Sequence, residues 1–126
     1  MKICVGLWID HKRAVIVIIN EKGEETKQIE SDMEKHVRFS GEAQKSTEED
    51  ISDRRFTNQL NKYYDEVIES IQIADSILVL GPGEAKIEFK KRLESKEIKK
   101  RLINIETVDK MSDNQIAAKV RQYFQP

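Results

Sequence analysis

Three short runs of residues open the chain and predict an antiparallel meander. Residues 3–9 form a nearly continuous apolar run, and residues 14–19 form a second run rich in β-branched side chains, which favour strands. Residues 20–23 predict a hairpin turn in which Gly23 takes a positive φ. Residues 24–31 are more polar, so we expect them to form a strand at an edge of the sheet.

A long helix is predicted next. Its apolar positions recur at spacings of three and four, which is typical of a helix buried along one side. They are Phe56, Leu60, Tyr63, Tyr64, Val67, Ile68 and Ile71. Residues 33–50 lack a clear period and contain Gly41, so they predict a long, mobile loop before this helix.

The remaining chain predicts two more strands and two more helices. Residues 77–80 indicate a short buried strand, followed by a helix that begins near Glu84 and by a basic turn or short helix at 95–100. Residues 102–108 indicate the fifth strand. A last helix is marked by two N-terminal signals, a capping box and a hydrophobic staple. They are formed by Ser112 with Gln115 and by Met111 with Ile116.

The element order is therefore β-β-β-α-β-α-β-α. Helical crossovers place the fourth and fifth strands parallel to their neighbours. We predict an α/β fold with a ribonuclease-H-like mixed five-stranded sheet and helices on its faces. With 126 residues, of which 38% are hydrophobic, the chain has enough apolar residues for one core, so residues 1–126 are predicted to be a single domain.

Composition narrows the environment and the partners. The net charge is −1, whereas a generic electrostatic binder of nucleic acid is usually basic. The single cysteine, Cys4, has no internal disulfide partner, which indicates a reducing compartment. No apolar stretch is long enough to cross a membrane, and the N-terminus lacks a signal-peptide layout. We expect a cytoplasmic protein with no membrane contact and no cofactor.

Three places in the sequence carry a family resemblance. They are residues 6–10 with residues 14–17, the pair Arg55 and Phe56 at the start of the long helix, and residues 77–86, a strand that ends in Gly-Pro-Gly before a lysine. In these features the chain resembles the middle domain of archaeal and eukaryotic peptide-release factors and of Pelota-type ribosome-rescue factors. It looks most like the stand-alone bacterial and archaeal relatives of that domain, and the resemblance spans almost the full length.

One departure from the family changes what the resemblance implies. In release factors the loop before the long helix carries Gly-Gly-Gln, which positions a water on the peptidyl-tRNA ester. In this sequence the corresponding loop keeps Gly41 and Gln44 but separates them by Glu42 and Ala43. Peptidyl-tRNA hydrolysis is therefore not implied. Pelota-type factors also lack the tripeptide and work by docking, so the resemblance implies a non-catalytic binding module associated with translation.

Charge is unevenly distributed along the chain. Residues 86–101 hold eight basic and three acidic side chains, a net charge of +5, whereas residues 42–53 hold five acidic and one basic, a net charge of −4. The basic residues are Lys86, Lys90, Lys91, Arg92, Lys96, Lys99, Lys100 and Arg101. Such asymmetry can steer a partner, and we expect this stretch to contact the ribosome, structured RNA or a protein. The alternative is a solvated helix surface with no partner.

The Gly81-Pro82-Gly83 turn has more than one interpretation. It can be a structural link between strand and helix, where proline is favoured in the first turn. With Lys86 it can also present N–H groups and a positive helix end to a phosphate, although the spacing of a Walker motif is absent.

A metal-dependent nuclease is the alternative function. In ribonuclease-H-like nucleases a carboxylate of the first strand binds Mg²⁺ with acidic partners from other elements. Asp10 is that carboxylate here, with Glu84 and Asp113, or Asp109, as its partners. The competing interpretation of Asp10 is a turn residue whose side chain bonds the following backbone. No catalytic set is evident. Self-association through an edge strand is a third possibility.

Overall fold

The computed structural model describes residues 2–31, 46–96 and 102–125, with residues 46–54 described by their backbone. Five strands and three helices lie in these ranges. They are β1 (Cys4–Ile9), β2 (Arg13–Asn20), β3 (Gly23–Glu30), α2 (Ser46–Ser70), β4 (Ser76–Gly81), α3 (Ala85–Lys96), β5 (Leu102–Thr107) and α4 (Asp113–Phe124).

The strands form one mixed sheet in the order β3-β2-β1-β4-β5. Strands β1, β2 and β3 pair antiparallel, and β4 and β5 pair parallel to their neighbours. This is the ribonuclease-H-like arrangement predicted from the sequence, which is thereby confirmed. The parallel strands are joined through α2 and α3 because a parallel connection needs a crossover long enough to return the chain.

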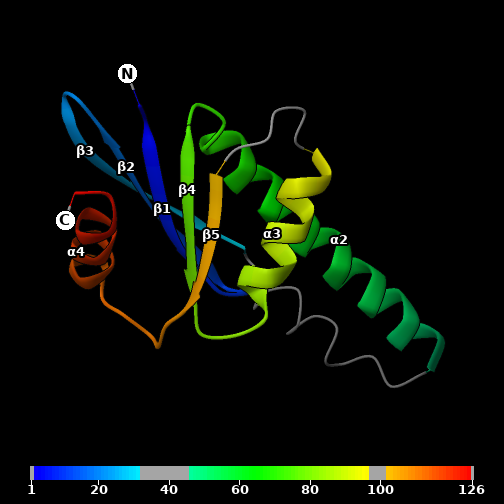
Figure 1. The fold of residues 1–126 in the computed structure, drawn as a ribbon. Coiled ribbons are helices and arrows are strands. Elements are labelled where there is room, and N and C mark those ends of the chain that lie inside the picture. The colour runs from blue at the N-terminus through cyan, green and yellow to red at the C-terminus, as the bar shows by residue number, and fades with distance from the viewer. Residues whose placement is uncertain (1, 32–45, 97–101, 126) are drawn as a thin grey trace.

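Each face of the sheet is covered by helices (Figure 1). Helices α2 and α3 pack on one face, where they share a core with odd-numbered residues of β1 such as Leu7. Helix α4 packs on the other face, where its core includes Trp8 and Val120. Strand β1 is buried on both faces, which explains its nearly continuous run of apolar residues.

Gly6 allows α4 to approach β1 closely. A Cβ atom at Gly6 would lie 2.3 Å and 2.6 Å from the two γ carbons of Val120. These separations are far below van der Waals contact, so only glycine permits the observed spacing between strand and helix at this point.

The ends of several elements also follow the sequence signals. Ser112 caps α4, its side chain accepts from the backbone N–H of Gln115, and the Gln115 side chain returns a bond to the backbone N–H of Ser112. Gly23, the first residue of β3, has φ of 141°. Strand β3 is the polar edge strand that the sequence predicts.

The loop predicted for residues 33–50 is wrong in its last part, because α2 already begins at Ser46. Residues 32–45 lie outside the described ranges. The sequence held a signal for the earlier start: Ser46 is followed three residues later by Glu49 within an acidic stretch, and both features favour a helix N-terminus. Absence of apolar periodicity concealed this part of the helix.

Phe56 was expected in the buried stripe of this helix, but it is 37% exposed. Figure 1 shows that the N-terminal part of α2 extends beyond the sheet, so this part of the helix has no strand beneath it. Tyr63 and Tyr64, expected in the same stripe, are both buried.

The contact between Gly6 and Val120 generates a double-mutant prediction. Gly6→Ala should lower the free energy of unfolding by about 1–3 kcal/mol, because the added methyl group overpacks the space beside Val120. Val120→Ala alone should cost about 2 kcal/mol through the cavity it leaves. In the double variant the new methyl group occupies part of that cavity, so chemical denaturation should show a loss smaller than the sum by about 1 kcal/mol or more. Strictly additive losses would contradict this packing.

Candidate functional site at the carboxyl end of the sheet and on helix α3

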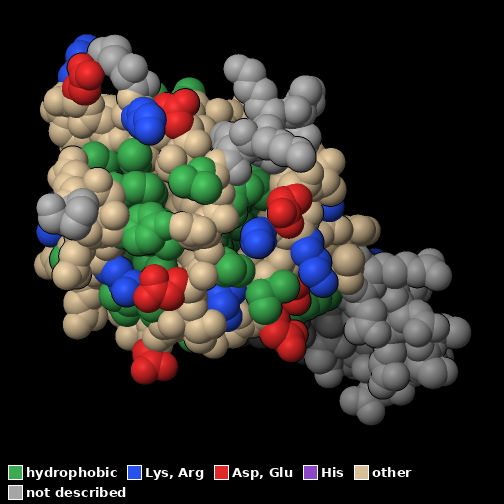
Figure 2. All heavy atoms as spheres, viewed as in Figure 1, with side chains coloured by type: hydrophobic (Ala, Val, Ile, Leu, Met, Phe, Trp, Pro, Cys, Tyr) green, Lys and Arg blue, Asp and Glu red, His purple; other side chains and the backbone are tan. Residues whose placement is uncertain are grey.

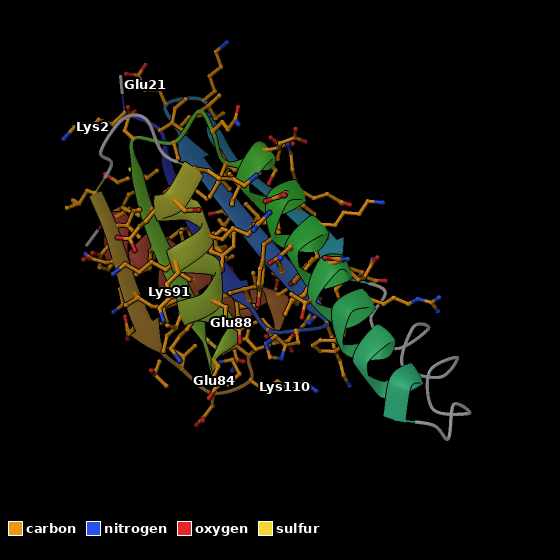
Figure 3. All side chains as sticks on the ribbon, turned by 90° about the vertical axis from the view of Figure 1, so that its right-hand side faces the viewer. Lys2, Glu21, Glu84, Glu88, Lys91 and Lys110 are labelled. Carbon is orange, nitrogen blue, oxygen red and sulfur yellow. The ribbon has the colours of Figure 1, made fainter. Side chains whose placement is uncertain are left out.

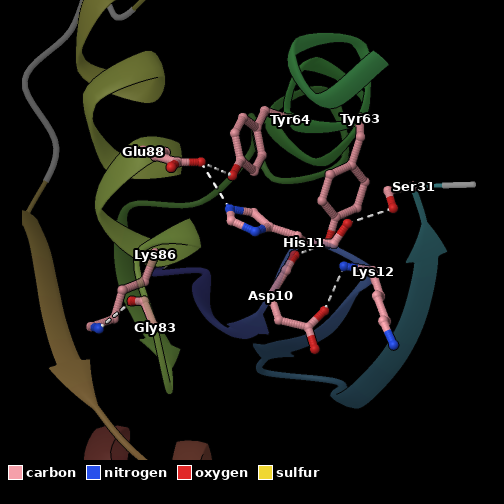
Figure 4. Close-up of polar contacts among 9 residues, drawn as sticks. All are labelled: Asp10, His11, Lys12, Ser31, Tyr63, Tyr64, Gly83, Lys86 and Glu88. Atoms are coloured by element: carbon pink, nitrogen blue, oxygen red, sulfur yellow. Dashed lines mark hydrogen bonds and ion pairs between the residues drawn. The ribbon is translucent and has the colours of Figure 1, made fainter. Parts of the chain in front are cut away.

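A group of polar side chains gathers where β1 and β4 end (Figure 4). We call this group the turn cluster. It comprises Asp10, His11, Ser31, Tyr63, Tyr64 and Glu88. Ligands of open α/β sheets bind outside the carboxyl ends of strands, where the direction of the connections changes.

Glu88 lies at the centre of one half of the cluster. Its Oε1 atom is 3.0 Å from His11 Nε2 and accepts a hydrogen bond of 2.8 Å from the Tyr64 hydroxyl. The Glu88 oxygen is thus shared between a phenol of α2 and the imidazole of the β1–β2 turn. These contacts tie the β1–β2 turn to both α2 and α3.

Backbone groups organise the other half. The Tyr63 hydroxyl donates to the Asp10 carbonyl oxygen at 3.0 Å, and the Ser31 hydroxyl donates to the His11 carbonyl oxygen at 2.6 Å. Burial raises the pKa of Tyr63 well above its usual value, and the Asp10 carboxylate raises it further. Burial and the hydrogen bond to Glu88 do the same for the pKa of Tyr64. Both phenols therefore remain protonated donors.

The carboxylates of the nuclease alternative have other partners. Asp10 Oδ1 accepts from the backbone N–H groups of Lys12 and Arg13, both at 2.8 Å, which is the turn-forming role. Asp113 pairs with Arg13 at 3.2 Å, and Glu84 is exposed at the start of α3.

Within the described residues no group of three or more His, Cys, Asp or Glu side chains is arranged to hold a metal ion. The metal-nuclease alternative is therefore not favoured.

The Gly81-Pro82-Gly83 turn is held by close packing. A Cβ atom at Gly81 would lie 2.5 Å from the carbonyl oxygen of Ile9, and backbone cannot move aside as a side chain can. Lys86, one of the predicted contact residues, is only 6% exposed, and its Nζ donates to the Gly83 carbonyl oxygen at 2.5 Å. Its ammonium group therefore closes the turn in this structure.

The predicted basic stretch divides into two groups on α3, which Figure 3 views from the helical side. Arg92 makes a bidentate ion pair with Asp65 of α2, with hydrogen bonds of 2.6 Å and 2.9 Å. Lys96 pairs with the same carboxylate at 3.2 Å. Lys90 and Lys91 have no ion-pair partner among the described residues. Two lysines thus remain available on α3, and we call them the α3 lysine pair.

Several predicted site residues lie outside the described residues. These are Gly41 and Gln44 of the loop, and Lys99, Lys100 and Arg101 of the basic stretch. No helix in the described part of the chain is long and apolar enough to cross a membrane.

The fold is similar to a segment of Pelota. The structure of the Pelota protein of Thermoplasma acidophilum matches 96% of this chain with a TM-score of 0.62 and 16% sequence identity. Pelota of Archaeoglobus fulgidus matches 97% with a TM-score of 0.54, also at 16% identity. The chain covers 32% and 35% of these two proteins, about a third of their length.

An archaeal translation termination factor, aRF1, is 15% identical to this chain, with a TM-score of 0.43. The match covers 98% of this chain and 39% of the aRF1 chain. Neither a protein-family model nor a curated protein sequence matches the chain. At these identities the likeness establishes a shared fold.

Sequence reasoning missed two features of the site. It did not connect His11 with Glu88, which is 77 positions away. It also counted Arg92 and Lys96 as free charges, because Asp65 belongs to another helix. The one available signal was that Tyr64 and Asp65 are adjacent on a helix that must pack beside α3.

The contact between Asp65 and α3 predicts a pH-dependent loss of stability. The hydrogen bond from Arg92 holds the pKa of Asp65 below its usual value. The stabilisation is therefore present above the pKa of the unfolded chain and is lost as pH falls through the lower folded pKa. Asp65→Asn should lower the free energy of unfolding at pH 7 by about 0.5–1 kcal/mol, since the pair is partly exposed.

Denaturant titrations from pH 7 down to about pH 2 test this prediction. The difference between wild type and Asp65→Asn should shrink and disappear in acid. Asp75→Asn is not a suitable control, because its carboxylate accepts from the Ile3 backbone. Glu66→Gln is suitable, as it removes an exposed charge from the next position of α2. An Asp65→Asn deficit that persists in acid would show that the ion pair is not its source.

Proposed function

We propose that this chain is a single, stand-alone relative of the middle domain of release factors and Pelota-type factors, and that it acts as a non-catalytic binding module associated with translation. Its partner in this proposal is the ribosome or another structured RNA, and its place of action is the cytoplasm. The observation that carries the proposal is the match of almost the whole chain to a segment of Pelota, together with the resemblance in the Gly-Pro-Gly region.

The organisation of the polar groups supports binding over catalysis. Every member of the turn cluster is engaged in holding turns and helices together, and His11 faces a carboxylate already bonded to Tyr64. Across the described residues the structure has no buried side-chain polar atom without a hydrogen-bond partner. Catalytic groups are commonly held in strained or incompletely satisfied surroundings.

The α3 lysine pair supports a polyanionic partner. Lysine side chains bind phosphate as mobile point charges. The other basic residues of the helix are already engaged: Arg92 and Lys96 with Asp65, and Lys86 with the Gly83 carbonyl oxygen. The sequence places Lys99, Lys100 and Arg101 shortly after the pair, which raises the local positive charge of this part of the chain. A patch of this kind gives affinity that falls as salt increases.

Co-sedimentation with ribosomes from the source organism tests the proposal. Wild type should appear in the ribosomal pellet at low salt and leave it as salt rises. Lys90→Ala/Lys91→Ala should weaken binding and reduce the slope of log affinity against log salt by about two, one for each lost phosphate contact.

Lys22→Ala/Lys27→Ala is the matched control, because it removes the same charge from the opposite edge of the sheet, where both lysines are exposed. It should bind as wild type does. No enrichment of wild type at low salt, or equal losses in the two double variants, would argue against the proposed contact.

A further inference from the structure

The two edges of the sheet differ in how they are protected. Edge strands expose unpaired N–H and C=O groups that can pair with another chain, and charged side chains are a common defence. Strand β3 carries three glutamates and one lysine along eight residues, so self-pairing would bring like charges together. Strand β5 has the sequence Leu-Ile-Asn-Ile-Glu-Thr, with a single charge. The β5 edge therefore lacks this protection.

Apolar side chains remain accessible along β5. Leu102 is 68% exposed, and Ile103 and Ile105 are half-buried against the core beneath α3. Figure 1 shows β5 as the outermost strand on the side opposite β3. In the same orientation Figure 2 shows hydrophobic side chains reaching the surface over the sheet, beside basic and acidic side chains. The edge thus combines free backbone groups with apolar surface.

We propose that β5 pairs antiparallel with β5 of a second copy of this chain, joining two sheets into one continuous sheet. A two-fold axis perpendicular to the sheet gives this arrangement, in which the same surface of each copy forms the interface. Residues directly opposite one another then point to the same face. The interface surface must therefore be complementary to a second copy of itself, and the sequence of β5 meets this requirement.

The register follows from the side-chain pattern. With Asn104 on the two-fold axis, Ile103 of each copy lies opposite Ile105 of the other, on the face that carries α3. A register centred on Ile105 would keep one such isoleucine pair and place the other isoleucines opposite threonine. Cross-strand pairs of β-branched residues stabilise a sheet, so the register centred on Asn104 is favoured.

Helix α3 extends the same complementarity. It runs opposite to β5, and twelve helical residues span about the same 17–18 Å as six strand residues. Lys90 and Glu94 are one turn apart, and neither has an ion-pair partner among the described residues. In the two-fold arrangement Lys90 of each copy approaches Glu94 of the other, so that Lys91 is the member of the α3 lysine pair that stays free in the dimer. A peptide strand from an unrelated protein would not be expected to match this charge pattern.

Charge exchange at Asn104 tests the proposal with the full chain alone. Its side chain is exposed and its amide donates to the Tyr123 hydroxyl at the surface, so Lys or Glu can replace it without disturbing the core. Wild type should show concentration-dependent dimerisation in sedimentation velocity between about 1 µM and about 300 µM, the range of a modest interface.

Asn104→Lys and Asn104→Glu each place two like charges opposite one another, so each variant should weaken the dimer at least about tenfold. An equal mixture of the two should restore dimerisation, because lysine then lies opposite glutamate. Recovery in the mixture cannot be explained by misfolding of either variant.

Two further variants complete the test. Thr26→Lys introduces the same charge at an exposed position of β3 and should leave dimerisation unchanged. Leu102→Glu should weaken the dimer in the same way as Asn104→Glu, because the proposed register places residue 102 opposite Glu106. Wild type that stays monomeric to about 300 µM would overturn the proposal. So would Asn104 variants that dimerise like wild type, or a dimer lost on Thr26→Lys. No ribosome is present, so the result is independent of the proposed function.

Discussion

Burial of β1 on both faces is the constraint on which the rest of the structure depends. The strand pairs antiparallel with β2 and parallel with β4, so it joins the meander to the helix-linked half of the sheet. Its odd-numbered residues enter the core beneath α2 and α3, while Trp8 enters the core beneath α4. Between them, Gly6 lets Val120 approach the backbone itself.

Polar chemistry is consequently confined to the ends and the outside of the sheet. At the carboxyl end the polar groups bond to one another. Glu88 accepts a hydrogen bond from Tyr64 and contacts His11, and the Asp10 side chain accepts from the backbone of the turn that follows it. On the outside of α3, Asp65 engages Arg92 and Lys96. Among the described residues, Lys90 and Lys91 of α3 have no ion-pair partner, and Leu102 lies exposed on the β5 edge.

The likeness to Pelota is a likeness of fold, and folds host unrelated functions. The likeness covers nearly the whole chain, so it includes the sheet, the crossover connections and the helices on both faces. The chemistry of any site must still come from this chain's own side chains.

The sequence by itself determined the strands, their order and the final capping box, because apolar periodicity and turn residues act locally. It failed at the start of α2, where polar helix turns extend past the core and leave no periodic signal. Only the tertiary structure decided which charges are free. The partners of Asp65 and Glu88 lie on the other of the two packed helices, α2 and α3. The Lys86 ammonium group donates to the Gly83 carbonyl oxygen. Such pairings depend on distances between elements far apart in sequence, and no local pattern encodes those distances.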